Sequence, residues 1–138
     1  MALTTAAGDD PFLRSITILP VADIEQSAAW YEHALGFETT YLHEGEGESE
    51  PTNYAILRRG RLVVHLILDE PLEHGSWTQV GTGKLYLIVR NVDELFEEVR
   101  SKGVEIAREL HIENWGARAF GLRDPSGNVI GIEQGQDA

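Results

Sequence analysis

The spacing of hydrophobic positions changes from the alternation of a strand to the period of a helix, and this change occurs twice along the chain. Residues 15–21 alternate as in a half-buried strand. Apolar side chains then recur at helical spacing, at Ile24, Ala28, Tyr31 and Leu35. Asp23 precedes this run and Gln26 follows three residues later, which is the spacing of a capping box. Gly36 is suited to the left-handed residue that ends a helix. The pattern predicts a strand, then a helix.

The same order recurs in residues 84–106. A strand-like run ends at Asn91, and Glu94 follows at the capping-box spacing. Apolar residues again recur at helical spacing, at Val92, Leu95, Phe96 and Val99. Gly103 is placed to end this second helix. Because the repeat is too long for a solenoid unit, it predicts a duplicated module.

Three more strands are predicted after each helix. They span residues 37–42, 53–58 and 61–68 in the first half, and 104–110, 117–123 and 128–134 in the second. The last two are joined by Asp124-Pro125-Ser126-Gly127, in which proline presets one backbone angle and glycine accepts a positive φ. We therefore predict a single domain, 1–138, with two βαβββ modules at about 13–70 and 84–134 and a linker at 71–83.

A module with four strands and one helix cannot cover both faces of its sheet. Two such modules side by side would form a curved, half-open, eight-stranded mixed sheet with the helices outside. The predicted class is therefore α+β, and the concave face is the expected ligand site.

Composition and charge narrow the function. The chain has 138 residues, 42% hydrophobic and 25% charged, as expected for one soluble globular domain. Its net charge of −12 disfavours nucleic acid and anionic membranes as partners and favours a cationic ligand, although many soluble proteins are simply acidic.

Without cysteine there are no disulfides or thiolate ligands. No apolar run approaches the roughly 20 residues of a membrane helix, and the N-terminus does not read as a signal peptide. A cytoplasmic location is expected.

Two stretches, "ILPVADIEQSAAWYEHALGF" and "WGARAFGLRDPSGN", resemble the vicinal oxygen chelate superfamily. This superfamily includes glyoxalase I, extradiol dioxygenases, fosfomycin-modifying enzymes and bleomycin resistance proteins. The resemblance covers residues 13–133, and the tail "ENWGARAFGLRDPSGNVIGIEQGQD" is most similar to the bleomycin resistance branch. The resemblance implies a homodimer that works without a metal and holds a cationic drug in acidic, aromatic-lined interface clefts.

The metal enzymes of the superfamily carry one His, Glu or Gln on each of four strands. The matching positions in this chain are Ile16, His65, Lys84 and Gly131. One of the four is a usable donor, whereas a catalytic metal needs about three protein ligands. The resemblance thus implies no catalytic residue and no cofactor. The alternative is one divalent ion, for which His65 and Glu133 are the candidate ligands.

The predicted ligand-binding residues are Tyr41, Tyr54, His65, Trp77, Trp115, Arg118 and Phe120. Trp77 and Trp115 lie in predicted loops, where an aromatic face can stack on a planar or cationic ligand. Closing the ends of the barrel or a dimer interface is an equally compatible role for both. Tyr41 and Tyr54 are equally compatible with ordinary packing on the sheet. His65 is a lone histidine in an apolar strand, and such a residue is more often a hydrogen-bonded core residue than a ligand.

The leading hypothesis is a metal-independent homodimer that sequesters a small, cationic molecule such as a bleomycin-type antibiotic. The alternative is a metal-dependent glyoxalase-like lyase, isomerase or dioxygenase that uses His65, Glu133 and His111. A regulatory or accessory binding module of the same fold is a third class.

Overall fold

The computed structural model describes residues 7–45, 50–68 and 79–136. A short 3-10 helix at Ala7–Asp9 precedes the first module. That module contains β1 (Thr17–Val21), α1 (Ile24–Leu35), β2 (Glu38–His43), β3 (Tyr54–Arg59) and β4 (Leu62–Leu68). The second contains β5 (Lys84–Val89), α2 (Val92–Ser101), β6 (Arg108–Ile112), β7 (Arg118–Arg123) and β8 (Val129–Gln134). The predicted α+β class with two βαβββ modules is confirmed.

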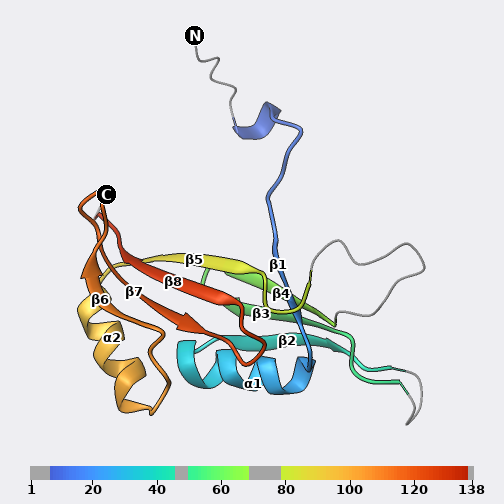
Figure 1. The fold of residues 1–138 in the computed structure, drawn as a ribbon. Coiled ribbons are helices and arrows are strands. Elements are labelled where there is room, and N and C mark those ends of the chain that lie inside the picture. Colours follow the sequence, from blue (N-terminus) through green and yellow to red (C-terminus); the bar gives the residue numbers. More distant parts are fainter. Residues whose placement is uncertain (1–6, 46–49, 69–78, 137–138) are drawn as a thin grey trace.

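The strands form two four-stranded mixed sheets, ordered β1-β4-β3-β2 and β5-β8-β7-β6. β1 runs parallel to β4, and β5 runs parallel to β8, while all other neighbouring strands are antiparallel. The expected eight strands are thus divided between two sheets, which meet where β1 contacts β5. Both helices lie on one side of the strands, and the N-terminal segment leaves the body on the other side (Figure 1).

Both predicted helix starts are capped as their sequences indicate. The Asp23 side chain accepts from the Gln26 amide at 2.9 Å, and the Asn91 side chain accepts from the Glu94 amide at 3.1 Å. Gly36 follows α1 with a φ of 68°. The helices cover the face of the sheets that carries the core, with Leu19, Leu57, Leu66, Leu122, Ile130 and Ile132 almost fully buried. We call the opposite, uncovered face the open face.

The second strand of the second module starts later than predicted. The sequence predicted residues 104–110, but β6 spans Arg108–Ile112. Val104 and Ile106 pack against the core without joining the sheet, so their apolar character came from packing and not from strand pairing. Pairing with β7 begins at Arg108, opposite Gly121, and is interrupted by a register shift before His111.

The turn between β7 and β8 joins the two modules. Asn128 is fully buried and donates to the Pro20 carbonyl at 2.9 Å, while its side-chain oxygen accepts from the Gly83 amide at 2.8 Å. The Tyr31 hydroxyl of α1 donates to Asp124 at 2.8 Å. Burial, together with the Asp124 carboxylate, raises the pKa of Tyr31 well above its ordinary range. The second module is thus hydrogen-bonded to both β1 and α1. Among the described residues, no helix has the length and apolar character to cross a membrane.

Candidate functional site

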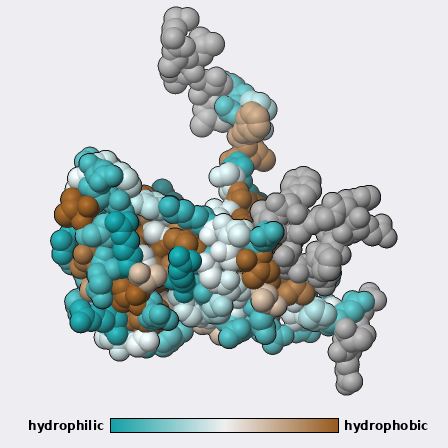
Figure 2. Space-filling view, viewed as in Figure 1, coloured by the Kyte–Doolittle hydropathy of each residue, from teal (hydrophilic) through white to brown (hydrophobic). Residues whose placement is uncertain are grey.

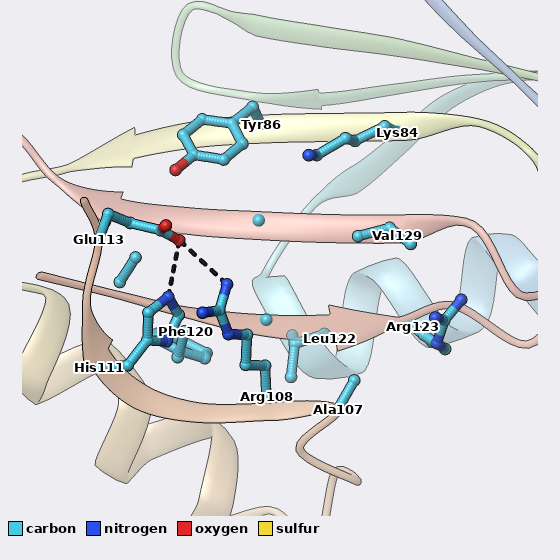
Figure 3. A pocket seen from close by; sticks show the side chains of 13 residues that line it. Lys84, Tyr86, Ala107, Arg108, His111, Glu113, Phe120, Leu122, Arg123 and Val129 are labelled. Atoms are coloured by element: carbon cyan, nitrogen blue, oxygen red, sulfur yellow. Dashed lines mark hydrogen bonds and ion pairs between the residues drawn. The ribbon is translucent and has the colours of Figure 1, made fainter. Parts of the chain in front are cut away.

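A cavity of about 270 Å³ lies on the open face of the second sheet (Figure 3). Gly121 of β7 and Gly131 of β8 are paired in register and both line it. A Cβ atom at Gly131 would lie 2.7 Å from the Tyr86 ring, and one at Gly121 would lie 3.4 Å from Cβ of Arg108. The paired glycines therefore let Tyr86 and Arg108 lie close to the sheet on either side of the cavity.

Glu113 holds a charged cluster at one edge of this cavity. Its Oε1 lies 2.6 Å from Nε2 of His111 and 3.2 Å from Nη1 of Arg108 (Figure 3). The hydrogen bond with His111 lowers the pKa of the Glu113 carboxyl, and Arg108 lowers it further, against the opposing effect of burial. Glu113 is therefore an anion that is held in place by two donors.

Glu133 ties two aromatic side chains together beside the cavity. Its Oε1 accepts from the Trp115 indole at 2.6 Å and from the Tyr86 hydroxyl at 3.1 Å. Burial raises the pKa of Tyr86, and the hydrogen bond to Glu133 adds to the shift. Trp115 remains 65% exposed, so its ring is available to a ligand. The arrangement places a carboxylate and two aromatic rings together on the open face.

Two further cations line the cavity. The Lys84 ammonium lies 5.7 Å from the centroid of the Tyr86 ring. Arg123 stands at the end of β7 and donates to the Gly127 carbonyl at 3.1 Å, which braces the turn. Lys84 and Tyr86 both point to this face because side chains two apart on a strand share one face.

The open face of the first sheet carries a different set of side chains. Tyr41, Ile56, His65 and Ile18 stand in one register row across its four strands. The Tyr54 hydroxyl and Nδ1 of His65 form a hydrogen bond. Burial lowers the pKa of His65, and Arg14 and Arg58 lower it further, while burial raises the pKa of Tyr54. The pair is therefore neutral near pH 7.

The structure brings only some of the predicted ligand residues together. Tyr41, Tyr54 and His65 share the open face of the first sheet, and Trp115 folds back to Glu133 of the second. Arg118 instead pairs with Asp93 of α2, with Nη2 at 2.7 Å from Oδ1, on the helix-covered side. The Phe120 side chain is 1% exposed and packs against Phe96. Trp77 lies outside the described residues.

Most residues of the cavity were not among the predicted ligand residues, and Lys84, Tyr86, Arg108 and Glu113 are the ones used in the argument. The alternation in "KLYLIV" could have identified Lys84 and Tyr86, because both occupy the polar phase of a strand whose Leu85 and Leu87 are buried. Arg108 and Glu113 had no such signal, since the register shift in β6 breaks the period between them.

Comparison with known proteins identifies the family. A model of the Glyoxalase/Bleomycin resistance protein/Dioxygenase superfamily matches residues 13–132. The chain belongs to this superfamily. Bleomycin resistance protein from Geobacillus stearothermophilus is 29% identical over 135 residues, covering 88% of this chain and 96% of that relative.

Two solved structures show the same fold. TioX from Micromonospora sp. ML1 superposes with a TM-score of 0.71 at 19% identity, over 89% of this chain and 98% of TioX. A bleomycin resistance determinant encoded on the transposon Tn5 gives a TM-score of 0.68 at 22% identity, over 91% of this chain and 100% of that one. Identities this low support the shared fold alone.

The resemblance implies a divalent metal in the superfamily's enzymes, and the described residues at the matching positions of this chain do not form a ligand set for one. His65 and Gly131 stand at equivalent register positions, each next to the first strand of its module. A side chain at Gly131 would collide with the Tyr86 ring, so a carboxylate could not simply take its place. Glu133, one step further along β8, is occupied by Trp115 and Tyr86. Within residues 7–45, 50–68 and 79–136, no three His, Cys, Asp or Glu side chains converge as a metal site.

Proposed function

We propose that this protein is a metal-independent binding protein that sequesters a small, cationic molecule, such as a bleomycin-type antibiotic, on its open face. The observation that carries the proposal is the Glu133 carboxylate held between Trp115 and Tyr86. The names of the relatives, bleomycin resistance proteins at 29% identity, support a drug of that class.

The physical basis is a cation beside a carboxylate and two aromatic faces. A cation over an aromatic ring gains about 0.5–2 kcal/mol, more when water is excluded. The net charge of −12 adds a long-range attraction that speeds the encounter at low salt and is screened within about 8–10 Å at physiological salt. The ligand is therefore expected to bind faster and more tightly as ionic strength falls.

Titration of bleomycin while recording tryptophan emission tests the proposal. Because the Trp115 ring is exposed on the open face, we expect a saturable change at micromolar drug. A Trp115→Phe variant should lose most of that change, which assigns it to this tryptophan. Constant emission throughout the titration would sink the bleomycin assignment.

Metal independence is a separate part of the proposal. The protein, purified without a His-tag and incubated in turn with Ni, Co, Zn, Mn and Fe(II), would be dialysed and subjected to elemental analysis. We expect no stoichiometric metal, because the donors are dispersed. Stoichiometric, tightly held metal would revive the lyase, isomerase or dioxygenase alternative and direct mutation to His65 and Glu133.

We also propose that the protein acts as a homodimer in the cytoplasm. Phe12 and Leu13 are 87% and 93% exposed, on a segment that leaves the body (Figure 1) and carries hydrophobic atoms into solvent (Figure 2). Such side chains gain by packing against a second copy. Sedimentation equilibrium should show a dimer, which dissociates more readily in a Phe12→Ser, Leu13→Ser variant. Arg14→Ser, a polar neighbour, is the control, and a monomeric wild type rejects the dimer.

A further inference from the structure

The cavity on the second sheet concentrates positive charge in an acidic protein. It is lined by three of the chain's 11 Lys and Arg residues, namely Lys84, Arg108 and Arg123, and by one carboxylate, Glu113. The sign of the local charge is thus opposite to that of the whole chain. A ligand group that enters this cavity meets positively charged side chains. At long range, by contrast, the negative net charge of the protein attracts cationic ligands.

Glu113 does not neutralise this cavity. Its single oxygen Oε1 serves both Arg108 and His111. The other nitrogen of His111, Nδ1, lies 2.8 Å from the Glu109 carbonyl oxygen. One carboxylate therefore faces the three cations Lys84, Arg108 and Arg123, and the lining of the cavity keeps a net positive charge.

Lys84 contacts the face of the Tyr86 ring and not a carboxylate. Its ammonium group forms no ion pair with any residue in the described ranges. Its side chain projects from β5 into the cavity, and Arg108 extends into the same cavity from β6 (Figure 3). An ammonium has three protons to donate and a guanidinium has five, so the pair can donate to one oxyanion between them.

We propose that Lys84 and Arg108 bind an anionic oxygen group, of the carboxylate class, on the ligand, while a planar part of the same ligand lies against Tyr86. The inference rests on the proposed function, because both place the ligand on the open face. It makes the ligand dipolar: a cationic group at Glu133 and an anionic group at Lys84, on either side of the Tyr86 ring. The cavity of about 270 Å³ falls below the roughly 300–1,000 Å³ of pockets for drug-sized molecules, so it accommodates one end of the ligand.

Three probes test the proposal, 2-naphthoate, 2-naphthamide and (2-naphthyl)methylammonium, which share the naphthalene ring system and differ in charge. Each is titrated to millimolar concentration into the full, ¹⁵N-labelled chain, and the amide resonances of Gly121 and Gly131 report the cavity. Naphthoate should shift both amides with saturation and weaken with salt. The neutral amide should bind about tenfold less tightly, as expected for loss of a charge-assisted hydrogen bond. The ammonium probe should leave both resonances in place.

The chain supplies a matched control, because it has two lysines. Lys84→Met should weaken naphthoate binding by about tenfold or more, and Lys84→Arg should retain it, which shows that the fold tolerates the site. Lys102→Met removes the same charge beside Glu98 at the end of α2 and should change the affinity by less than about twofold.

Equal shifts with the anionic and cationic probes, no shift with naphthoate, or unchanged naphthoate binding in Lys84→Met would each overturn the proposal. The result is separable from the bleomycin titration, which depends on Glu133 and Trp115. Bleomycin binding without naphthoate shifts rejects the anion site and leaves the proposed function standing. Naphthoate shifts that depend on Lys84, without bleomycin binding, uphold the anion site and reject the drug.

Discussion

Glu133 accepts a hydrogen bond from the Trp115 indole at 2.6 Å, across a hairpin that separates the two residues in sequence. The same oxygen accepts from Tyr86. An indole N–H can only donate, so Glu133 is the acceptor in this contact. Both bonds use Oε1, and Oε2 is the oxygen that a ligand can approach.

Glu133→Gln should weaken the binding of a cationic ligand by roughly tenfold. Glutamine keeps a carbonyl oxygen for Trp115 and Tyr86 but removes the charge that attracts the cation. The affinity would be measured by the bleomycin titration at two salt concentrations. Glu97→Gln on the exposed side of α2 makes the same change in net charge and should have little effect. Equal affinities for the two variants would exclude Glu133 from the site.

Tyr31→Phe should lower the free energy of unfolding by about 1–3 kcal/mol, the usual contribution of a buried hydrogen bond to a charged group. The variant leaves Asp124, which is 4% exposed, without the hydroxyl that links it to α1. Urea unfolding would measure the loss. Tyr41→Phe removes a hydroxyl from an exposed ring and should cost less than about 0.5 kcal/mol. Similar losses in both variants would contradict the role of the turn as a link between modules.

Gly131→Ala should displace the Tyr86 ring, since the new methyl group would lie 2.7 Å from two of its carbons. We expect a loss of about 1 kcal/mol or more in unfolding free energy, because overpacking forces side chains to move. Emission of Trp115 should also change, since it shares Glu133 with Tyr86. Gly121→Ala meets Cβ of Arg108 at 3.4 Å and should be milder. A reversed order of the two losses would refute this account of the paired glycines.

The Glu113 cluster predicts a pH dependence of stability. His111 and Arg108 on the same hairpin, and Lys84 on β5, favour its charged form, so its pKa in the folded protein lies below the ordinary 4.5. A depressed pKa gives stability that is fully present above pH 4.5 and is lost as the pH falls through the lower folded value. Melting temperatures of the wild type and Glu113→Gln should therefore differ most above pH 4.5 and converge in acid. A difference in melting temperature that stays constant down to pH 3 would contradict a stabilising role for the charged Glu113 carboxylate.

Local sequence patterns predicted the fold because local and global preferences agree in this chain. Asp23 and Asn91 cap the helices that their spacing indicates. Glu133 stands two residues after Gly131 on β8 and therefore shares its face. Strand β8 continues to Gln134, so Glu133 does reach the open face.

The candidate site was harder to predict, for reasons that specific residues explain. Arg118 was expected at the cavity, but Ala119, Phe120, Gly121 and Leu122 are all buried, so β7 shows no polar alternation from which to read its faces. Arg108 and Glu113 meet because of an irregular register, which periodicity cannot reveal. Lys84 was visible in the sequence, but only as a poor metal ligand.

The two hairpins that end the modules differ in what they tolerate. The hairpin between β3 and β4 turns at Gly60, where an added Cβ atom would have nothing within 4 Å. The corresponding hairpin between β7 and β8 inserts Asn128 between Pro20 and Gly83 and so fixes its own length. Gly60 has a φ of 57°, which a side chain would strain, so peptide tags or evolutionary insertions should be accepted beside Gly60 and not in its place. Insertions in the 124–128 turn would break the contacts between the two modules. Duplication of the module therefore left the β3–β4 loop free to diversify and the β7–β8 loop constrained.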